Sequence, residues 1–239
     1  MTKRYLNQND KFVKDLINSI EPDFIFSAKP INRFKTKNIE VKNFEKNKLD
    51  KIADLKKKIN SIENCNLKEN SKGLVIGEGD IDSSIMLVGE APGFEEDSSG
   101  LPFQGKVGEL LNKMLIAINI KREKIYLSYS VNFRTPEDRK PTSLEIRRYS
   151  KFLKEHISII NPKIIILMGS TAMEAITGSI RKISEERGKW KEIIINNKTY
   201  LTMITFHPAY LLRQADQKKY SWADLKEIRK RIDELNIIL

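Results

Sequence analysis

Short apolar runs that end in glycine constrain the fold of this chain more than any other feature of its sequence. Residues 85–88 form one such run, followed by Gly89, and residues 164–168 form another, followed by Gly169. Runs of this kind are typical of strands buried on both faces. Amphipathic helical stretches separate them, and strands that alternate with helices indicate a parallel sheet. We therefore expect an α/β fold, a three-layer sandwich with a central four-stranded, mainly parallel sheet flanked by helices.

Apolar periodicity places the individual elements. One helix is marked by apolar residues that recur at steps of three and four and so share a face: Leu49, Ile52, Leu55, Ile59 and Ile62. The expected strands are residues 85–88, 124–131, 162–168 and 199–205. The expected helices are residues 47–62, 107–119, 143–160, 170–176 and 223–235. Parallel sheets of this type bind ligands at the carboxyl ends of their strands, so we expect the functional site there.

The first part of the chain differs from the rest in charge and pattern. Residues 1–68 contain 16 Lys and Arg against 9 Asp and Glu, which gives +7 of the formal net charge of +11. We expect residues 1–45 to form a basic, weakly ordered or peripheral extension and residues 46–239 to form the α/β domain. A basic chain of this size suits a polyanion such as nucleic acid. A general bias toward Lys, Asn and Ile explains the charge equally well.

The composition also excludes several classes of protein. The apolar runs are far shorter than the roughly 20 residues that a membrane span needs. The first ten residues are polar, which does not indicate a secretory signal, so we expect a cytoplasmic protein without a membrane partner. Cys65 is the only cysteine. A single thiol excludes an internal disulfide, a multi-cysteine zinc site and an iron–sulfur cluster held by this chain alone.

An acidic turn follows the first expected strand. It runs from Gly89 to Asp97 and contains Glu90 and Glu96. Glycine in such a turn permits close approach of the backbone to a ligand. An acid at a strand end can orient a water molecule or stabilise a developing cation. The alternative interpretation of the same residues is an acidic surface loop.

An aromatic residue and a histidine occupy two further loops. Phe103 lies in a Pro- and Gly-rich loop before a helix, where its ring can stack on a flat ligand such as a base or simply fill the start of the helix. His207 directly follows the last expected strand and is either a functional or a structural histidine. The next residues combine apolar wedges with a cation, which suits insertion into a duplex beside phosphates. They are Tyr210, Leu211, Leu212 and Arg213.

A basic, proline-containing loop follows the second expected strand. It spans residues 132–141 and includes Arg134 and Arg139. A rigid basic loop at the edge of a sheet can contact phosphates. A solvated connection between two elements explains the same residues equally well.

Together and in this order, the segments resemble the uracil-DNA glycosylase superfamily, most closely its family 4 branch, whose members usually carry an iron–sulfur cluster. The resemblance covers roughly residues 64–224. It rests on Gly-Glu-Ala-Pro-Gly, Pro-Phe-x-Gly-x-x-Gly-x-Leu-Leu, Arg-x-Pro-x-x-Arg-x-Pro and His-Pro-Ala-Tyr-Leu-Leu-Arg. It implies a monomeric DNA repair enzyme that flips uracil out of single- or double-stranded DNA. Such an enzyme hydrolyses the N-glycosidic bond and leaves an abasic site.

The resemblance also implies roles for individual residues. Glu90 takes the acidic position of the catalytic turn, His207 donates to uracil O2, and Glu96 supports the site. Ala91 fills a small-residue position, Phe103 stacks on the flipped base, and Tyr129 stands where the base is read. The implied DNA-binding residues are Arg134, Arg139, Ser170, Tyr210, Leu211, Leu212 and Arg213.

Two departures from the family pattern bear on this interpretation. Cys65 matches one of the four cluster ligands, but the other three positions hold Ile62, Phe133 and Tyr149, so we expect no cluster and no other cofactor. Tyr129 replaces the asparagine that reads the uracil edge, and its phenol offers a donor and an acceptor in a different place. A catalytically weakened or specificity-shifted DNA-binding relative is therefore the alternative, and an unrelated α/β binding module is a third.

Overall fold

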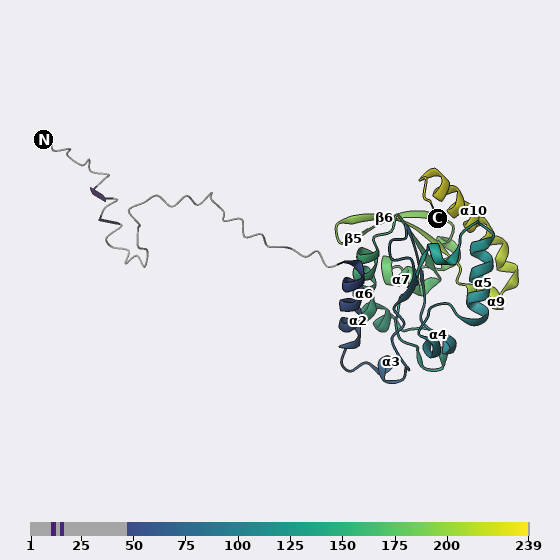
Figure 1. Cartoon of the computed structure of the whole chain (residues 1–239), viewed down its shortest axis with the longest axis horizontal. Coiled ribbons are helices and arrows are strands. Elements are labelled where there is room, and N and C mark those ends of the chain that lie inside the picture. The colour runs from purple at the N-terminus through teal and green to yellow at the C-terminus, as the bar shows by residue number, and fades with distance from the viewer. Residues whose placement is uncertain (1–10, 13–14, 17–46, 239) are drawn as a thin grey trace. The chain divides into compact units, whose positions relative to one another are not determined.

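The computed structural model describes residues 11–12, 15–16 and 47–238 of the chain. Figure 1 shows this described part as a ribbon, with most of its helices and the strands β5 and β6 labelled. The basic extension expected at residues 1–45 lies almost entirely outside the described residues, so its state of order stays a prediction.

A six-stranded sheet forms the centre of the described fold, in the order β1-β3-β2-β4-β6-β5. The four inner strands are parallel to one another: β2 (Ile85–Gly89), β3 (Tyr126–Tyr129), β4 (Ile164–Met168) and β6 (Lys198–Thr205). The two edge strands, β1 (Gly77–Gly79) and β5 (Trp190–Ile195), are antiparallel to their neighbours. The expected α/β fold with a mainly parallel sheet is confirmed.

The expected number of four strands is wrong, because both edge strands carry weak signals. β1 has three residues, two of them glycine, and so shows no apolar alternation. β5 and β6 form a hairpin whose turn residues, Asn196 and Asn197, both have positive φ. Two such residues between strands are typical of a tight hairpin turn, and this was the available signal for β5.

Helices cover both faces of the sheet, as Figure 1 shows, and make three layers. One face is covered by α2 (Lys48–Asn60), α6 (Ser143–Ile160) and α7 (Ser170–Thr177). The other is covered by α5 (Gly105–Ile116), α9 (Pro208–Arg213) and α10 (Lys218–Glu234). The short helices are α3 (Asn66–Glu69), α4 (Phe94–Ser99) and α8 (Ile183–Glu186), with single 3-10 turns at Arg122–Lys124, Pro136–Asp138 and Ala215–Gln217.

Strand β2 illustrates how the core is divided between the two faces. Met86 and Val88 pack among the side chains of α2, α6 and α7, whereas Ile85 and Leu87 pack among those of α5 and α10. This alternation is the period of two that a strand imposes on its side chains. Because both faces are apolar, the strand reads in the sequence as a continuous apolar run.

One expected core residue lies elsewhere. The apolar periodicity predicts Leu49 on the buried face of the first helix, but its side chain is 62% exposed. It belongs to the first turn of α2, which begins at Lys48 and whose buried residues begin at Ile52. Among the described residues, no helix is long and apolar enough to cross a membrane.

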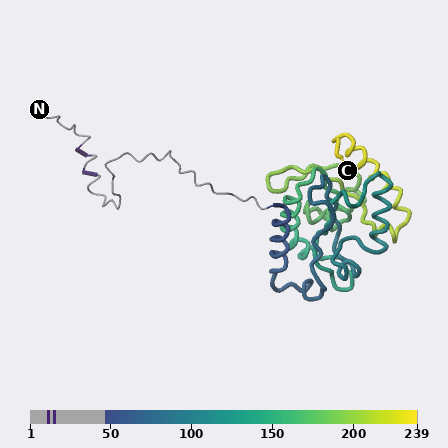
Figure 2. The backbone as a smooth tube through the Cα atoms, viewed as in Figure 1, coloured from purple at the N-terminus to yellow at the C-terminus, as the bar shows by residue number. Residues whose placement is uncertain are grey.

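The tube in Figure 2 shows the same backbone path, coloured by residue number. The four inner strands are parallel, so their carboxyl ends meet at one edge of the sheet. The loops after β2, β3, β4 and β6 therefore come together in space, although more than 100 residues separate the first from the last.

Candidate functional site

A cavity of about 560 Å³ opens at the carboxyl ends of the inner strands. We call it the cleft. It collects residues from all four of the loops that follow these strands. The predicted site residues that line it are Glu90, Ala91, Glu96, Tyr129, Arg139, Ser170, His207, Tyr210 and Arg213. Phe103, Arg134, Leu211 and Leu212 do not belong to its lining.

Glu90 follows the last residue of β2 and is fixed from the neighbouring loop. Its Oε2 accepts a hydrogen bond of 2.6 Å from the hydroxyl of Thr171, in the first turn of α7. Because β2 and β4 are adjacent and parallel, the loop after β4 brings Thr171 to this position. The bond holds one carboxylate oxygen and thereby sets the orientation of the other.

His207 lies at the end of β6, where it also caps the start of α9. Its Nδ1 accepts a hydrogen bond of 3.2 Å from the backbone N–H of Ala209. A neutral imidazole that accepts at Nδ1 carries its proton on Nε2. Burial, with a smaller contribution from the cation of Arg213, lowers the pKa of His207 to about 4. At neutral pH the ring is therefore uncharged, and its buried Nε2 has no hydrogen-bond partner among the described residues.

Glu96 braces the loop around the cleft. One carboxylate oxygen accepts from the backbone N–H of Gly93 at 2.9 Å, and the other accepts from the N–H of Gln104 at 3.0 Å. Both bonds end on loop backbone rather than on side chains. Glu96 therefore ties the turn after β2 to the loop that precedes α5.

Phe103 is almost completely buried, at 1% exposed, and adopts a positive φ of 52°. Its ring lies 4.9 Å from the ring of Tyr129 and 5.8 Å from that of His207, measured between centroids. Arg122 supports its backbone, because Nη1 donates to the carbonyl of Phe103 at 3.2 Å and Nη2 to that of Pro102 at 2.6 Å. In this arrangement the ring is covered, and stacking on a base requires a neighbouring ring to move.

Tyr129 covers Phe103 from the end of β3. Its hydroxyl accepts from the backbone N–H of Phe103 at 2.8 Å and donates to Glu96 Oε1 at 3.3 Å. Burial and the charge of Glu96 raise the pKa of the phenol well above its usual value. Gly89 permits this packing, because a Cβ there would lie 2.7 Å from the Phe103 ring and 2.8 Å from the Tyr129 ring. The hydroxyl of Tyr129 therefore donates its one hydrogen to Glu96 and cannot also donate it to a ligand.

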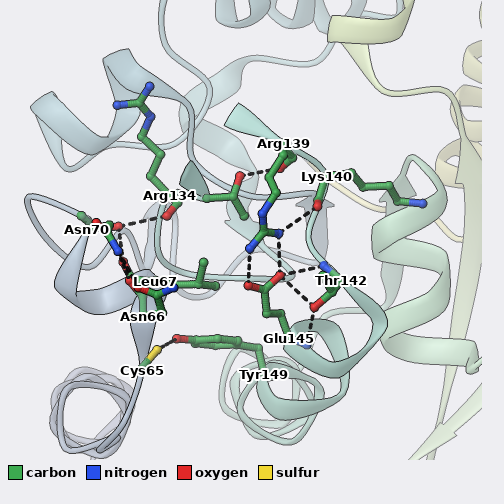
Figure 3. Close-up of polar contacts among 12 residues, drawn as sticks. Cys65, Asn66, Leu67, Asn70, Arg134, Arg139, Lys140, Thr142, Glu145 and Tyr149 are labelled. Carbon is green, nitrogen blue, oxygen red and sulfur yellow. Dashed lines mark hydrogen bonds and ion pairs between the residues drawn. The ribbon is translucent and has the colours of Figure 1, made fainter. Parts of the chain in front are cut away.

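The two arginines of the basic loop, Arg134 and Arg139, are both paired with carboxylates. Arg134 donates from Nε to Asp138 at 2.7 Å and from Nη2 at 3.0 Å. Arg139 donates to Glu145 from both terminal nitrogens, at 2.8 and 2.7 Å (Figure 3). The pKa of Glu145 is lowered to about 2, mainly by this pair. Pairing neutralises much of the charge that the basic loop brings to the cleft.

Two other cations in the cleft have no carboxylate partner among the described residues. Arg213 is one, and it was predicted. Lys140 is the other, and its Nζ donates to the hydroxyl of Ser170 at 3.0 Å. Sequence reasoning included Lys140 in the basic loop but did not select it. The signal that distinguishes it from Arg139 is the absence of a carboxylate at a suitable spacing, since Glu145 serves Arg139.

The expected apolar wedge is divided between core and surface. Leu211 is 1% exposed and belongs to the core beneath α9. Leu212 is 44% exposed, and the ring of Tyr210 packs 5.0 Å from that of Phe206. Of the two leucines, only Leu212 is placed on the surface, where DNA can reach it.

The four positions that match the family's cluster ligands converge on one apolar core. The Sγ of Cys65 lies 3.2 Å from the hydroxyl of Tyr149, and the rings of Tyr149 and Phe133 lie 6.2 Å apart. Figure 3 shows the contact between Cys65 and Tyr149. Ile62 packs against the same core. One thiol cannot replace four thiolates, so these residues do not fit an iron–sulfur cluster. Across the described ranges, no group of three or more potential ligands could hold a metal ion.

Several residues that shape the site were missed from the sequence. Arg122 also pairs with Glu78 at 2.8 Å, so it ties the Phe103 loop to strand β1. Asp224 on α10 accepts from Thr205 at 2.7 Å and from Arg187, and the guanidinium of Arg187 lies over the ring of Phe206. These contacts fix the end of β6 just before His207. Each of these contacts joins residues that are far apart in the chain, so no local sequence pattern predicts it.

Comparison with known proteins gives a consistent result. The profile of the Uracil DNA glycosylase superfamily matches residues 76–228, more than half of the chain. A type-4 uracil-DNA glycosylase of Thermotoga maritima is 40% identical over 150 residues, which cover 62% of this chain and 77% of that protein. One of Archaeoglobus fulgidus is 30% identical over 184 residues, covering 75% and 92% respectively. A DNA polymerase of Bacillus phage SP01 is 31% identical over 161 residues, which cover 67% of this chain but only 17% of the polymerase.

Proposed function

The chain belongs to the uracil DNA glycosylase superfamily, and we propose that it is a uracil-DNA glycosylase. In this proposal it flips uracil out of DNA, hydrolyses the N-glycosidic bond and leaves an abasic site. The observation that carries the proposal is the convergence of Glu90 and a neutral His207 on one cleft, from loops at opposite ends of the domain's sequence. The relatives named as type-4 uracil-DNA glycosylases support the choice of uracil and DNA.

The chemistry follows from the two groups. As the bond between C1′ and the base nitrogen breaks, its electron pair passes to the base, and negative charge develops on O2. The N–H at Nε2 of His207 donates a hydrogen bond to that oxygen. The ring is neutral and is held by the Ala209 N–H before the substrate arrives, so His207 does not have to lose a proton before it acts. Glu90 stabilises the cationic sugar and orients the water whose oxygen bonds to C1′. The proton that this water loses passes to the departing uracil anion, so the products are free uracil and an abasic site. Preorganised electrostatic stabilisation of this type is usually the largest contribution to catalysis.

The test is excision of uracil from single-stranded and duplex oligonucleotides, followed by alkaline cleavage at the abasic site. We expect His207→Ala to lower the rate constant by about 10²- to 10³-fold, as loss of an oxyanion donor does elsewhere. Asp233→Ala, an exposed change on α10, is the control and should retain full activity. An absence of excision at enzyme excess, or a His207→Ala variant as active as the wild type, contradicts the proposal.

A second candidate function is favoured by the contacts of Tyr129. Its donor is occupied by Glu96, and its ring covers Phe103. A protein with this arrangement can be a catalytically weakened or specificity-shifted relative that binds DNA. Tyr129→Asn and Tyr129→Phe separate the two candidates. A gain of tenfold or more in uracil excision for the asparagine variant alone favours the second candidate, whereas no gain in either variant favours the first.

The remaining parts of the proposal concern cofactor, partners and location. We propose that the protein needs no cofactor, since aromatic side chains fill the volume around Cys65. Its partner is uracil-containing DNA in single- or double-stranded form, contacted by Lys140, Ser170, Arg213 and the exposed Leu212. We propose that it acts as a monomer in the cytoplasm. Residues 46–239 carry the activity, and the basic residues 1–45 add affinity for DNA.

A further inference from the structure

A second cavity, of about 470 Å³, lies between α6 and α7, and none of its lining residues also lines the cleft. One wall is a face of α6 that carries Arg147, Lys151 and Lys154. The other wall is the end of α7, with Glu174 and the segment that reaches Ile180. We call this cavity the α6 groove. None of its lining residues has a role in the cleft.

The cations of the α6 groove differ from most arginines near the cleft, because they are not neutralised. Within residues 47–238, neither Arg147 nor Lys154 has a carboxylate partner, and Lys151 lies over the Phe152 ring at 4.8 Å. Glu174 is the only acidic residue in the lining. Three cations against one carboxylate leave the groove with a positive charge that a polyanion can neutralise.

The spacing of these cations suits a regular chain of anions. Steps of four and three residues place the three side chains on one face of the helix. At 1.5 Å per residue, the seven residues from Arg147 to Lys154 span about 10 Å along the helix axis. One strand of B-DNA rises about 3.4 Å per nucleotide, so this face can meet two or three successive phosphates.

The α6 groove and the cleft lie at opposite ends of one short helix, α7. Helix α7 starts at Ser170, which lines the cleft, and its cap Gly178 lines the α6 groove. A helix of eight residues is about 12 Å long. Lys140, bonded to Ser170, precedes the start of α6 by three residues. The unpaired cations therefore continue from the cleft to the groove around a single short helix.

From these contacts we infer that the α6 groove binds the phosphodiester backbone of DNA on one side of the nucleotide held in the cleft. The inference rests on the proposed function for the choice of DNA as the polyanion. It adds a surface that the proposed reaction does not use. It also assigns most of the contacts with the DNA phosphates to α6, because Arg134 and Arg139 are already paired with carboxylates.

The experiment compares two triple variants with equal loss of charge. The test variant is Arg147→Gln, Lys151→Gln, Lys154→Gln. The control variant is Lys113→Gln, Lys226→Gln, Lys230→Gln, three exposed lysines of α5 and α10 that line neither cavity. Binding of a fluorescent duplex without uracil is measured over a salt series, so the result does not depend on catalysis. Urea unfolding of each variant checks that the fold is retained.

We expect the test variant to reduce the steepness of log K against log salt by about 2 to 3, since each lost phosphate contact removes about 0.9 from the slope. The control variant should change it by less than 1. Equal changes in both variants, or no change in either, overturn the inference. A wild-type protein that excises no uracil counts against the proposed function and leaves this comparison of slopes intact.

Discussion

At the scale of single residues, the hydroxyl of Tyr129 contributes to the stability of the fold. Its hydroxyl is the partner of the buried Phe103 N–H, and a buried donor without a partner costs about 1–3 kcal/mol. We expect Tyr129→Phe to lower the free energy of unfolding by about that amount, measured in urea. Tyr220→Phe removes a hydroxyl from a ring that is 44% exposed and should change it by less than about 0.5 kcal/mol. Equal effects in both variants would falsify this reading of the contact.

A buried histidine gives the molecule a pH dependence. His156 on α6 is 2% exposed and contacts the hydroxyl of Tyr126 at 3.0 Å, and burial lowers its pKa to about 3. In the unfolded chain the imidazole of His156 binds a proton near pH 6.5, whereas in the folded protein it stays neutral at that pH. The contribution of His156 is therefore complete above pH 6.5 and is lost as the pH falls below it.

We expect the free energy of unfolding to fall between pH 6 and pH 4.5. His156 and His207 each contribute up to about 1.4 kcal/mol per pH unit in that window. His156→Gln retains a partner for Tyr126 and should roughly halve the dependence. Urea unfolding at several pH values measures it, and an unchanged dependence in the variant assigns the effect to other groups.

At the scale of elements, helix α10 supplies the carboxylate of one buried and of one exposed ion pair, and these two pairs can be compared directly. Asp224 is 1% exposed, pairs with Arg187 and accepts from Thr205, whereas Asp233 pairs with Arg229 on the same helix at the surface. Breaking a buried pair leaves a buried charge and costs about 3–5 kcal/mol. An exposed pair contributes about 0–1 kcal/mol.

We therefore expect Asp224→Ala to destabilise the protein by about 3–5 kcal/mol and Asp233→Ala by less than about 1 kcal/mol. Thermal or urea unfolding measures both. Because Asp224 also fixes the end of β6 before His207, we expect the first variant alone to lose excision activity under conditions where it remains folded. Similar losses of stability in both variants are the contrary outcome.

The sequence predicted the inner elements well. The helix expected at residues 143–160 has those bounds in the structure, and each inner strand lies within or beside its expected range. These elements are predictable because their burial repeats with the period of the backbone. The edge strands β1 and β5 were not predicted, because an edge strand lacks a neighbour on one side and carries a weaker apolar pattern.

At the scale of the whole molecule, the proposal that this chain holds no iron–sulfur cluster can be tested directly. We expect protein from iron-supplemented cells to contain far less than one iron per chain and to lack the visible absorption of an iron–sulfur cluster. A chelator should leave the unfolding temperature unchanged, because Cys65, Phe133 and Tyr149 pack together as core. Stoichiometric iron, or a loss of stability with chelator, contradicts the proposal.

The two apolar cores of the described fold lie between residues 52 and 237. We therefore expect removal of residues 1–45 to change the free energy of unfolding by less than about 1 kcal/mol, as urea unfolding can show. The shortened chain should also show a weaker salt dependence of DNA binding, since it loses basic residues. A shortened chain that cannot fold would show that the extension belongs to the core.

Apolar periodicity alone specified the layers of the fold and the edge of the sheet where the candidate site lies. Periods of two and of three to four residues specify strands and helices, and parallel strands bring Glu90 and His207 to the same side. Three features came from the folded contacts instead: Tyr129 covers Phe103, Arg122 holds that loop, and Arg139 pairs with a carboxylate while Lys140 does not within the described part of the chain. Those outcomes depend on contacts between side chains of distant segments, and a local pattern records the burial of a residue but not the identity of its partner.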